Sequence, residues 1–364
     1  MRVIPFLKAK KGQVVVLILA LCLFILTACS GELEVTPAAS AGGHLEAVST
    51  VASVSKEATP VSTISSAVSA AGKVAVVNNQ AQNIAVKPSS VEKAVVPELN
   101  YTSGFYKFPY ANSEYFVHLP PHLQPNHPLQ VVVAVHGMGG NGSSFGQPLI
   151  SYADESGFAL VAPTMKYDNN YFDPNIVASN DGHLLPELHQ LIHSLPAQLH
   201  HSVRSKVLLF GFSRGSQIVH RYAFFYPQDV LGVAAMSAGS YTLPEQSYQA
   251  TTNAAKTTLK FPFGLSDLSA YTGTAIDLQA IRQIPFWLGV GGADNTKTGV
   301  PPAWTPYQGS TRLERAQRFY KILQNEGINA TLTIFPGVGH AVCTGMKQDA
   351  FSFFNRLAAE TGQA

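Results

Sequence analysis

The sequence carries little charge and few cysteines for its length. Its 364 residues include 24 Lys or Arg and 22 Asp or Glu, so the formal net charge is only +2. A balance this close to neutral argues against the extended basic footprint with which proteins bind nucleic acid. With only Cys22, Cys29 and Cys343 present, a disulfide framework is also excluded.

Aromatic residues are absent from a long stretch near the N-terminus. Residues 30–100 contain no Phe, Tyr or Trp, are rich in Ala, Val, Ser and Thr, and are interrupted by prolines. A segment of this composition cannot easily bury enough apolar surface to build a core, so we interpret residues 29–100 as a tether. Its many valines leave one alternative open, in which short strands form only against a partner.

The first 28 residues have the parts of a secretory signal peptide. Basic residues precede an uncharged apolar run from Val14 to Ala28, which is shorter than the ~20 residues of a membrane-spanning helix. The run ends in Leu26-Thr-Ala-Cys29, which resembles a bacterial lipobox. Residues 1–28 are therefore predicted to be removed, and Cys29 is predicted to carry the lipid. An ordinary signal peptide is the alternative.

Lipidation at Cys29 would anchor the protein to a membrane leaflet in the bacterial cell envelope. Ser30 follows the cysteine, and the absence of aspartate there favours the outer membrane, facing the periplasm or the surface. Cleavage after Ala28 leaves 20 basic and 22 acidic residues, a formal charge of −2. The lipid rather than basic charge would therefore hold the protein at the membrane.

The folded domain is expected over residues 101–364, where aromatic residues begin. Short apolar runs there alternate with segments of helical spacing, which predicts an α/β fold with a mostly parallel central sheet and helices on both faces. We expect a helix over 181–200, limited by Pro186 and Pro196, and an early edge strand over 115–119. The expected buried strands are 130–136, 158–163, 207–210, 230–238, 284–290 and 330–335.

One stretch carries the strongest functional signal. The apolar run Val207–Phe210 enters Gly211-Phe-Ser213-Arg-Gly215, and a segment of helical spacing leaves it. Strand, G-x-S-x-G and helix in this order are typical of a nucleophile elbow, which exposes the serine hydroxyl at a helix N-terminus. The pentapeptide alone also fits a helix cap after a buried strand, so the interpretation depends on the partners of Ser213.

An acid and a histidine follow Ser213 in the order that the elbow requires. Asp294 comes just after the predicted strand 284–290, and His340 ends the loop that follows the last predicted strand. The order Ser213, Asp294, His340 predicts a nucleophile, an acid that orients the imidazole, and a general base. Asp277 is a rival acid, but no strand leads into it.

A glycine-rich loop, His136-Gly-Met-Gly-Gly-Asn-Gly142, follows the predicted strand 130–136. We expect the backbone N–H groups of Met138, in this loop, and of Arg214, just after Ser213, to form an oxyanion hole. The alternative is that this loop is only a turn between a strand and a helix and has no part in an oxyanion hole. His136 precedes the serine in the chain, so we expect it to shape the loop and not to act as the base.

Residues 241–283 break the alternation of strands and helices. We interpret them as a candidate cap or substrate wall, with a structural excursion as the alternative. Nearby aromatics, Trp287, Trp304 and Tyr307, would either line an apolar pocket or belong to the core.

Neither a metal site nor a cofactor is expected. His189 and His193 share a helical face, but they lack the glutamate of an H-E-x-x-H motif. This pattern indicates a solvated histidine-rich surface and not a zinc site.

The domain resembles the α/β-hydrolase superfamily, and within it the bacterial secreted esterases of the polyhydroxybutyrate-depolymerase-like or feruloyl-esterase-like group. The resemblance spans roughly residues 110–360 and rests on His136-Gly-Met-Gly-Gly-Asn141, Gly211–Gly215, Gly291-Gly-Ala-Asp294 and Gly337-Val-Gly-His340. It implies a cofactor-independent serine esterase that forms an acyl-enzyme with a small-molecule or polymeric carboxylic ester. A peptidase or acyltransferase with the same triad, or a non-catalytic envelope binding protein of the same fold, are the alternatives.

Overall fold

The computed structural model describes residues 104–124 and 126–360 of the chain. The predicted signal peptide (1–28), Cys29 and the tether (29–100) lie outside the described residues and stay predictions. Within the described residues, no helix combines the length and the apolar character that a membrane span needs.

A single eight-stranded sheet organises the described residues, with the strand order β1-β2-β4-β3-β5-β6-β9-β10. β2 pairs antiparallel with both β1 and β4, and the remaining neighbours pair parallel. The strands of the sheet are β1 (Gly104–Tyr110), β2 (Ser113–Leu119), β3 (Val131–Val135), β4 (Ala159–Pro163), β5 (Val207–Phe212), β6 (Val230–Met236), β9 (Phe286–Gly291) and β10 (Ala330–Phe335), while β7 (Ser247–Tyr248) and β8 (Thr257–Thr258) form a separate ribbon.

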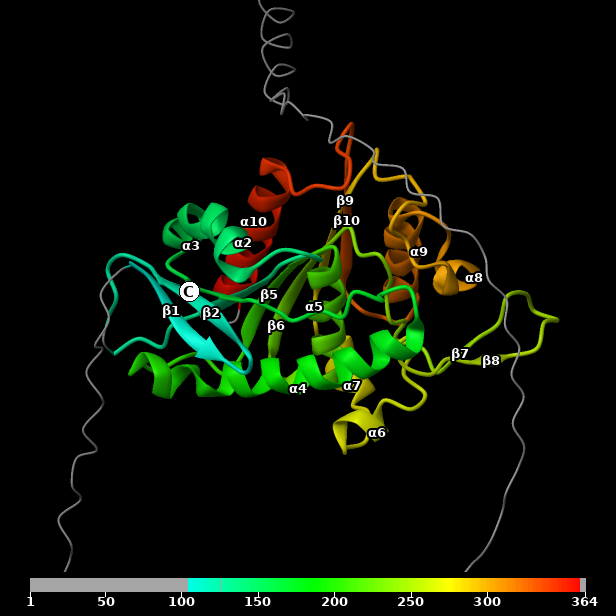
Figure 1. Cartoon of the computed structure of the whole chain (residues 1–364), viewed down its shortest axis with the longest axis horizontal. Helices are drawn as coiled ribbons and strands as arrows, with labels where there is room; N and C mark the ends of the chain where they lie inside the picture. Colours follow the sequence, from blue (N-terminus) through cyan, green and yellow to red (C-terminus); the bar gives the residue numbers. More distant parts are fainter. Residues whose placement is uncertain (1–103, 125, 361–364) are drawn as a thin grey trace, which may run out of the picture. The chain divides into compact units, whose positions relative to one another are not determined.

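Helices cover both faces of this sheet (Figure 1). They are α2 (Gly142–Gly146), α3 (Ile150–Ser156), α4 (Pro174–Leu199), α5 (Arg214–Phe225), α6 (Ser269–Thr272), α7 (Leu278–Arg282), α8 (Thr305–Gln308), α9 (Arg312–Asn325) and α10 (Thr344–Glu360), joined by the 3-10 turns η1 (Gln147–Leu149), η2 (Pro227–Asp229) and η3 (Pro302–Trp304).

The side chains of each inner strand alternate between two buried clusters. On β3, Val131 and Val133 join the cluster that includes residues of α4, α5 and α9, whereas Val132 joins the cluster that includes residues of α3 and α10. Because both faces are buried, the inner strands read as continuous apolar runs in the sequence. The predicted α/β architecture is confirmed.

Two local predictions are wrong. Residues 115–119 belong to β2, which lies between β1 and β4, so β1 and not β2 is the edge strand. The helix predicted over 181–200 begins already at Pro174, and both Pro186 and Pro196 lie inside it. A proline in a helix interior costs about 3 kcal/mol, and the apolar stripe that α4 buries against the sheet offsets this cost.

Residues 241–283 contain β7, β8, α6 and α7. Several of their apolar side chains, including Tyr241, Leu243 and Leu265, are completely buried in the same cluster as α5 and α9. This segment is therefore anchored in the core on one face of the sheet.

Candidate active site

Ser213 occupies the sharp turn between β5 and α5. Its backbone has φ 56° and ψ −116°, an unusual conformation for a residue other than glycine, and its N–H donates to Met236 O at 2.9 Å. A Cβ on Gly211 would lie 2.5 Å from Gly215 O, and a Cβ on Gly215 would lie 1.9 Å from Val135 O. Larger residues would collide with the backbone at both positions, which is why the turn has glycine on either side of Ser213.

Ser213, His340 and Asp294 form a continuous chain of hydrogen bonds. His340 Nε2 lies 2.9 Å from Ser213 Oγ, and His340 Nδ1 lies 2.8 Å from Asp294 Oδ2. A carboxylate can only accept, so Nδ1 carries the proton and Nε2 is left to accept from the serine hydroxyl. The ring of His340 also packs against that of Phe212, with 4.8 Å between centroids. Three residues that are distant in the sequence thus meet in the predicted order.

Asp277, the rival acid, has a different environment. Its side chain caps α7 by accepting from Ala280 N–H at 2.9 Å, and it also accepts from Gln228 Nε2 at 3.2 Å. The structure therefore places Asp294, and not Asp277, beside His340.

Arg312, at the start of α9, is a site residue that the sequence analysis missed. Its guanidinium lies 3.5 Å from the second oxygen of Asp294, and it donates to the backbone oxygens of Thr298 at 3.2 Å and Gly299 at 2.8 Å. Arg312 and Asp294 are both buried, so the guanidinium gives a buried counter-charge to the carboxylate that accepts from His340. No motif pointed to Arg312, because its pairing with Asp294 depends on how α9 packs.

A cavity of about 270 Å³ opens beside Ser213. The predicted oxyanion residues Met138 and Arg214 border it together with Ser213 and His340. Four of the five predicted catalytic and oxyanion residues thus line one cavity, and the fifth, Asp294, lies behind His340 and does not line it. Its other lining residues are Gly137, Tyr171, Phe212, Gln217, Gly239, Gly299 and Arg312.

The lining of this cavity bears on two alternatives that the sequence left open. Among the described residues, no member of 241–283 lines it, so the segment proposed as a cap does not form this wall. Trp287, Trp304 and Tyr307 do not line it either, and Trp304 is fully buried against Phe263. A larger cavity of about 510 Å³, lined mainly by residues 120–130, contains neither Ser213 nor His340.

His136 supports the glycine-rich loop, as the sequence analysis expected. Its Nδ1 lies 2.6 Å from Gly137 O, and its Nε2 accepts from Met165 N–H at 2.9 Å. The hydroxyl of Tyr167 donates to His136 O at 2.7 Å. These bonds use both ring nitrogens of a neutral imidazole and attach the start of the loop to the segment after β4.

A buried charge cluster lies behind the serine turn. Asp181 of α4 accepts from the guanidinium groups of Arg214 and Arg221, which are both on α5. Arg221 also donates to Thr242 Oγ1 and Ser240 Oγ, each at 3.0 Å. One carboxylate therefore holds two arginines, and one of these directly follows Ser213.

Acid is expected to destabilise the fold through buried histidines. His220, fully buried, has Nδ1 2.8 Å from Ser216 O and accepts at Nε2 from Thr242 N–H at 2.9 Å. Burial lowers the pKa of His220 well below 6.5, and it also lowers the pKa of His136 below that value.

Between the lowered pKa and 6.5, the unfolded chain binds more protons at these histidines than the folded chain does. The free energy of unfolding should therefore fall as the pH drops below 6.5, by up to about 1.4 kcal/mol per pH unit for each histidine. Urea unfolding from about pH 7 to about pH 5 measures this slope. The exposed His183, replaced by glutamine, is the control that should leave the slope unchanged. A slope that is flat in the wild type would contradict the prediction.

The eight-stranded sheet, its two helical layers and the serine turn together define the α/β-hydrolase fold. Among solved structures, poly(aspartic acid) hydrolase-1 from Sphingomonas sp. KT-1 has a similar fold, with a TM-score of 0.53 and 21% sequence identity. The superposition covers 69% of this chain and 98% of that one.

A sequence relative supplies a more specific comparison. Feruloyl esterase B of Thermothelomyces thermophilus is 30% identical over 134 residues, which are 35% of this chain and 44% of the esterase. The matched region thus spans less than half of that relative. No family model matches the chain.

Proposed function

We propose that the protein is a serine esterase that hydrolyses carboxylic esters through an acyl-enzyme. The observation that carries this proposal is the hydrogen-bonded chain from Ser213 Oγ through His340 to Asp294. The cavity beside Ser213 and the partial similarity to feruloyl esterase B support it. No step of this chemistry needs a metal or a cofactor.

In the proposed mechanism Ser213 Oγ attacks the carbonyl carbon of the ester and its proton passes to His340 Nε2. Asp294 keeps the imidazole oriented and stabilises the imidazolium without taking the proton. The Met138 and Arg214 N–H groups stabilise the tetrahedral oxyanion, each contributing about 3 kcal/mol to the barrier reduction. The alkoxide then leaves with the proton from Nε2. Water, activated by the same nitrogen, hydrolyses the acyl-enzyme.

A fluorophosphonate probe tests for the activated serine without a guess at the substrate. The purified full chain should gain the mass of one phosphonyl group, the Ser213→Ala variant should gain none, and a Ser216→Ala control should label like the wild type. A folded wild type that takes up no label would contradict the proposal and favour the binding-protein alternative.

The acyl acceptor distinguishes an esterase from its two enzymatic alternatives. Matched aryl esters and aryl amides of acetic, butyric and ferulic acids should show faster ester than amide hydrolysis. Faster amide cleavage would favour a peptidase. With an added alcohol, a predominance of the new ester over the free acid would favour an acyltransferase.

Asp294→Asn is expected to lower kcat by about 10³- to 10⁴-fold while the fold stays intact, because an amide does not hold the required tautomer or stabilise the imidazolium. Steady-state kinetics on a chromogenic ester measures the loss. Asp277→Asn is the matched control, since asparagine caps a helix as well as aspartate does, and it should retain wild-type kcat. Wild-type turnover in Asp294→Asn, or a large loss in Asp277→Asn, would show that the acid is misassigned.

A further inference from the structure

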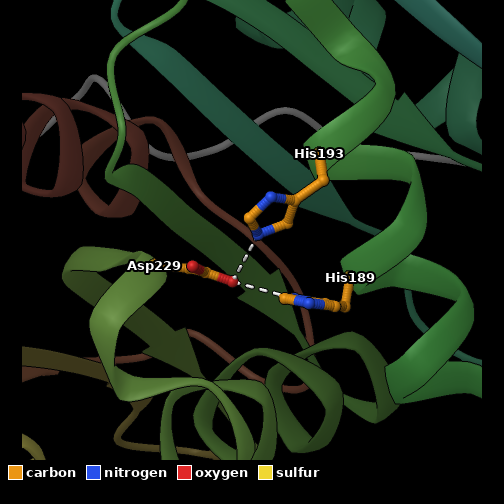
Figure 2. A group of neighbouring side chains, drawn as sticks. All are labelled: His189, His193 and Asp229. Atoms are coloured by element: carbon orange, nitrogen blue, oxygen red, sulfur yellow. Dashed lines mark hydrogen bonds and ion pairs between the residues drawn. The ribbon is translucent and has the colours of Figure 1, made fainter. Parts of the chain in front are cut away.

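Three potential metal ligands meet at a place that the proposed esterase chemistry does not use. His189 and His193 project from α4, and Asp229 ends η2 opposite them (Figure 2). Asp229 Oδ2 lies 2.9 Å from His189 Nδ1 and 3.1 Å from His193 Nε2. All three ligand atoms lie within 4.8 Å of one another.

The surroundings hold two of these side chains in place. Tyr222, which is fully buried on α5, donates its hydroxyl to Asp229 Oδ2 at 3.0 Å. The ring of His189 stacks on that of Tyr226, with 4.0 Å between centroids and 9° between planes. A hydrogen bond to the carboxylate and a stacked imidazole are the kind of outer contacts that orient metal ligands.

The donor set suits a divalent transition metal ion. Imidazole nitrogen and carboxylate oxygen bind Zn²⁺ at about 2.0–2.2 Å, so the ligand atoms of a tetrahedral site lie ~3.3 Å apart. The separations of 2.9 and 3.1 Å from Asp229 Oδ2 are close to this value. Three protein ligands leave a fourth position for water, as in many zinc sites.

We propose that His189 Nδ1, His193 Nε2 and Asp229 Oδ2 bind one divalent first-row transition ion, for which Zn²⁺ is the probe. In the bound state each ring carries its proton on the nitrogen that faces away from the ion. The ion would cross-link α4 to the connection between α5 and β6. None of the three ligands lines the cavity beside Ser213, so we expect an effect on stability and not on ester turnover.

The site also changes the interpretation of the two histidines. Their spacing of four residues places both rings on one face of α4, but the third ligand lies 36 residues beyond His193. A solvated histidine surface was therefore the natural expectation from the sequence, and the carboxylate becomes visible only when η2 packs against α4.

Zinc titration of the full chain, stripped with EDTA, tests the proposal. Isothermal titration calorimetry should show one ion per chain that is lost, or bound at least about tenfold more weakly, in both His193→Gln and Asp229→Asn. Saturating Zn²⁺ should raise the Tm of the wild type by about 5 °C or more and leave the Tm of His193→Gln nearly unchanged.

Two features of the chain make this test decisive. The His193 side chain is 56% exposed, so its replacement by glutamine spares the core, and a circular dichroism melt without zinc confirms folding. His183→Gln, on the exposed face of the same helix, is the matched control and should bind like the wild type. Ions bound elsewhere remain in every variant and cancel in the comparison.

The proposal is overturned if the wild type binds no Zn²⁺, or if His193→Gln and Asp229→Asn bind as many ions as tightly as the wild type.

Discussion

Replacement of Ser213 by alanine is expected to lower ester turnover by about 10⁴- to 10⁶-fold and to leave the fold intact. Alanine lacks the Oγ atom that lies 2.9 Å from His340 Nε2, so no acyl-enzyme can form. The loss is large because His340 and Asp294 act on the substrate through this atom. The initial rate with a chromogenic acetate ester gives kcat/KM, and a thermal melt followed by circular dichroism reports the fold.

Ser216→Ala is the matched control for this variant. Ser216 lies on α5 three residues beyond Ser213, and its buried hydroxyl has no hydrogen-bond partner among the described residues. Its removal should leave both activity and stability close to those of the wild type. If Ser213→Ala kept more than about a hundredth of the wild-type turnover, Ser213 would not be the nucleophile.

The second large effect concerns stability. Asp181→Asn is expected to lower the free energy of unfolding by about 3–5 kcal/mol, because it removes the carboxylate that pairs with both Arg214 and Arg221 in a buried cluster. Burial already lowers the pKa of Arg221 to about 10, and the neighbouring Arg214 charge adds to this effect. Asparagine keeps the shape of the side chain but leaves two buried guanidinium groups without a counter-charge. Urea unfolding measures the loss.

An exposed ion pair provides the comparison. Glu114 pairs with Lys107 on the β1–β2 hairpin, where the lysine side chain is 62% exposed. Glu114→Gln should cost no more than about 1 kcal/mol, since solvent screens such pairs. Equal losses in the two variants would contradict the view that burial makes the Asp181 cluster costly to break.

Asp181→Asn should also slow ester turnover in molecules that remain folded. Asp181 anchors the side chain of Arg214, whose backbone N–H is a proposed oxyanion donor. A fall in kcat at a temperature where the variant is fully folded, with little change in KM, would identify Asp181 as a positioning residue. A purely structural role would leave kcat unchanged under those conditions.

Local signals in the sequence were sufficient to predict most strands of the sheet and the order of the site residues along the chain. Buried parallel strands are continuous apolar runs because both of their faces are covered, so most of the inner strands are visible without any structure. The serine turn is visible because only glycine fits beside Ser213. Parallel strands bring their carboxyl ends to one edge of the sheet. Ser213, Asp294 and His340 each follow the end of such a strand, so the sequence predicts that they meet at this edge.

Tertiary packing decided what lies around these residues. Arg312 pairs with Asp294 because of where α9 docks, and Asp181 holds Arg214 because α4 begins before Asp181 and packs against α5. Residues 241–283 bury several of their aromatic and aliphatic side chains in the core, and other loops line the cavity beside Ser213.

The chain alone thus determines the fold class and the identity and order of the candidate triad, because these depend on periodicity, on steric limits at single residues and on chain order. Only the tertiary structure decides which charges pair, which loops form the cavity, and that Asp229 lies between His189 and His193. Those contacts join residues that are 18 or more positions apart, and no local pattern encodes them.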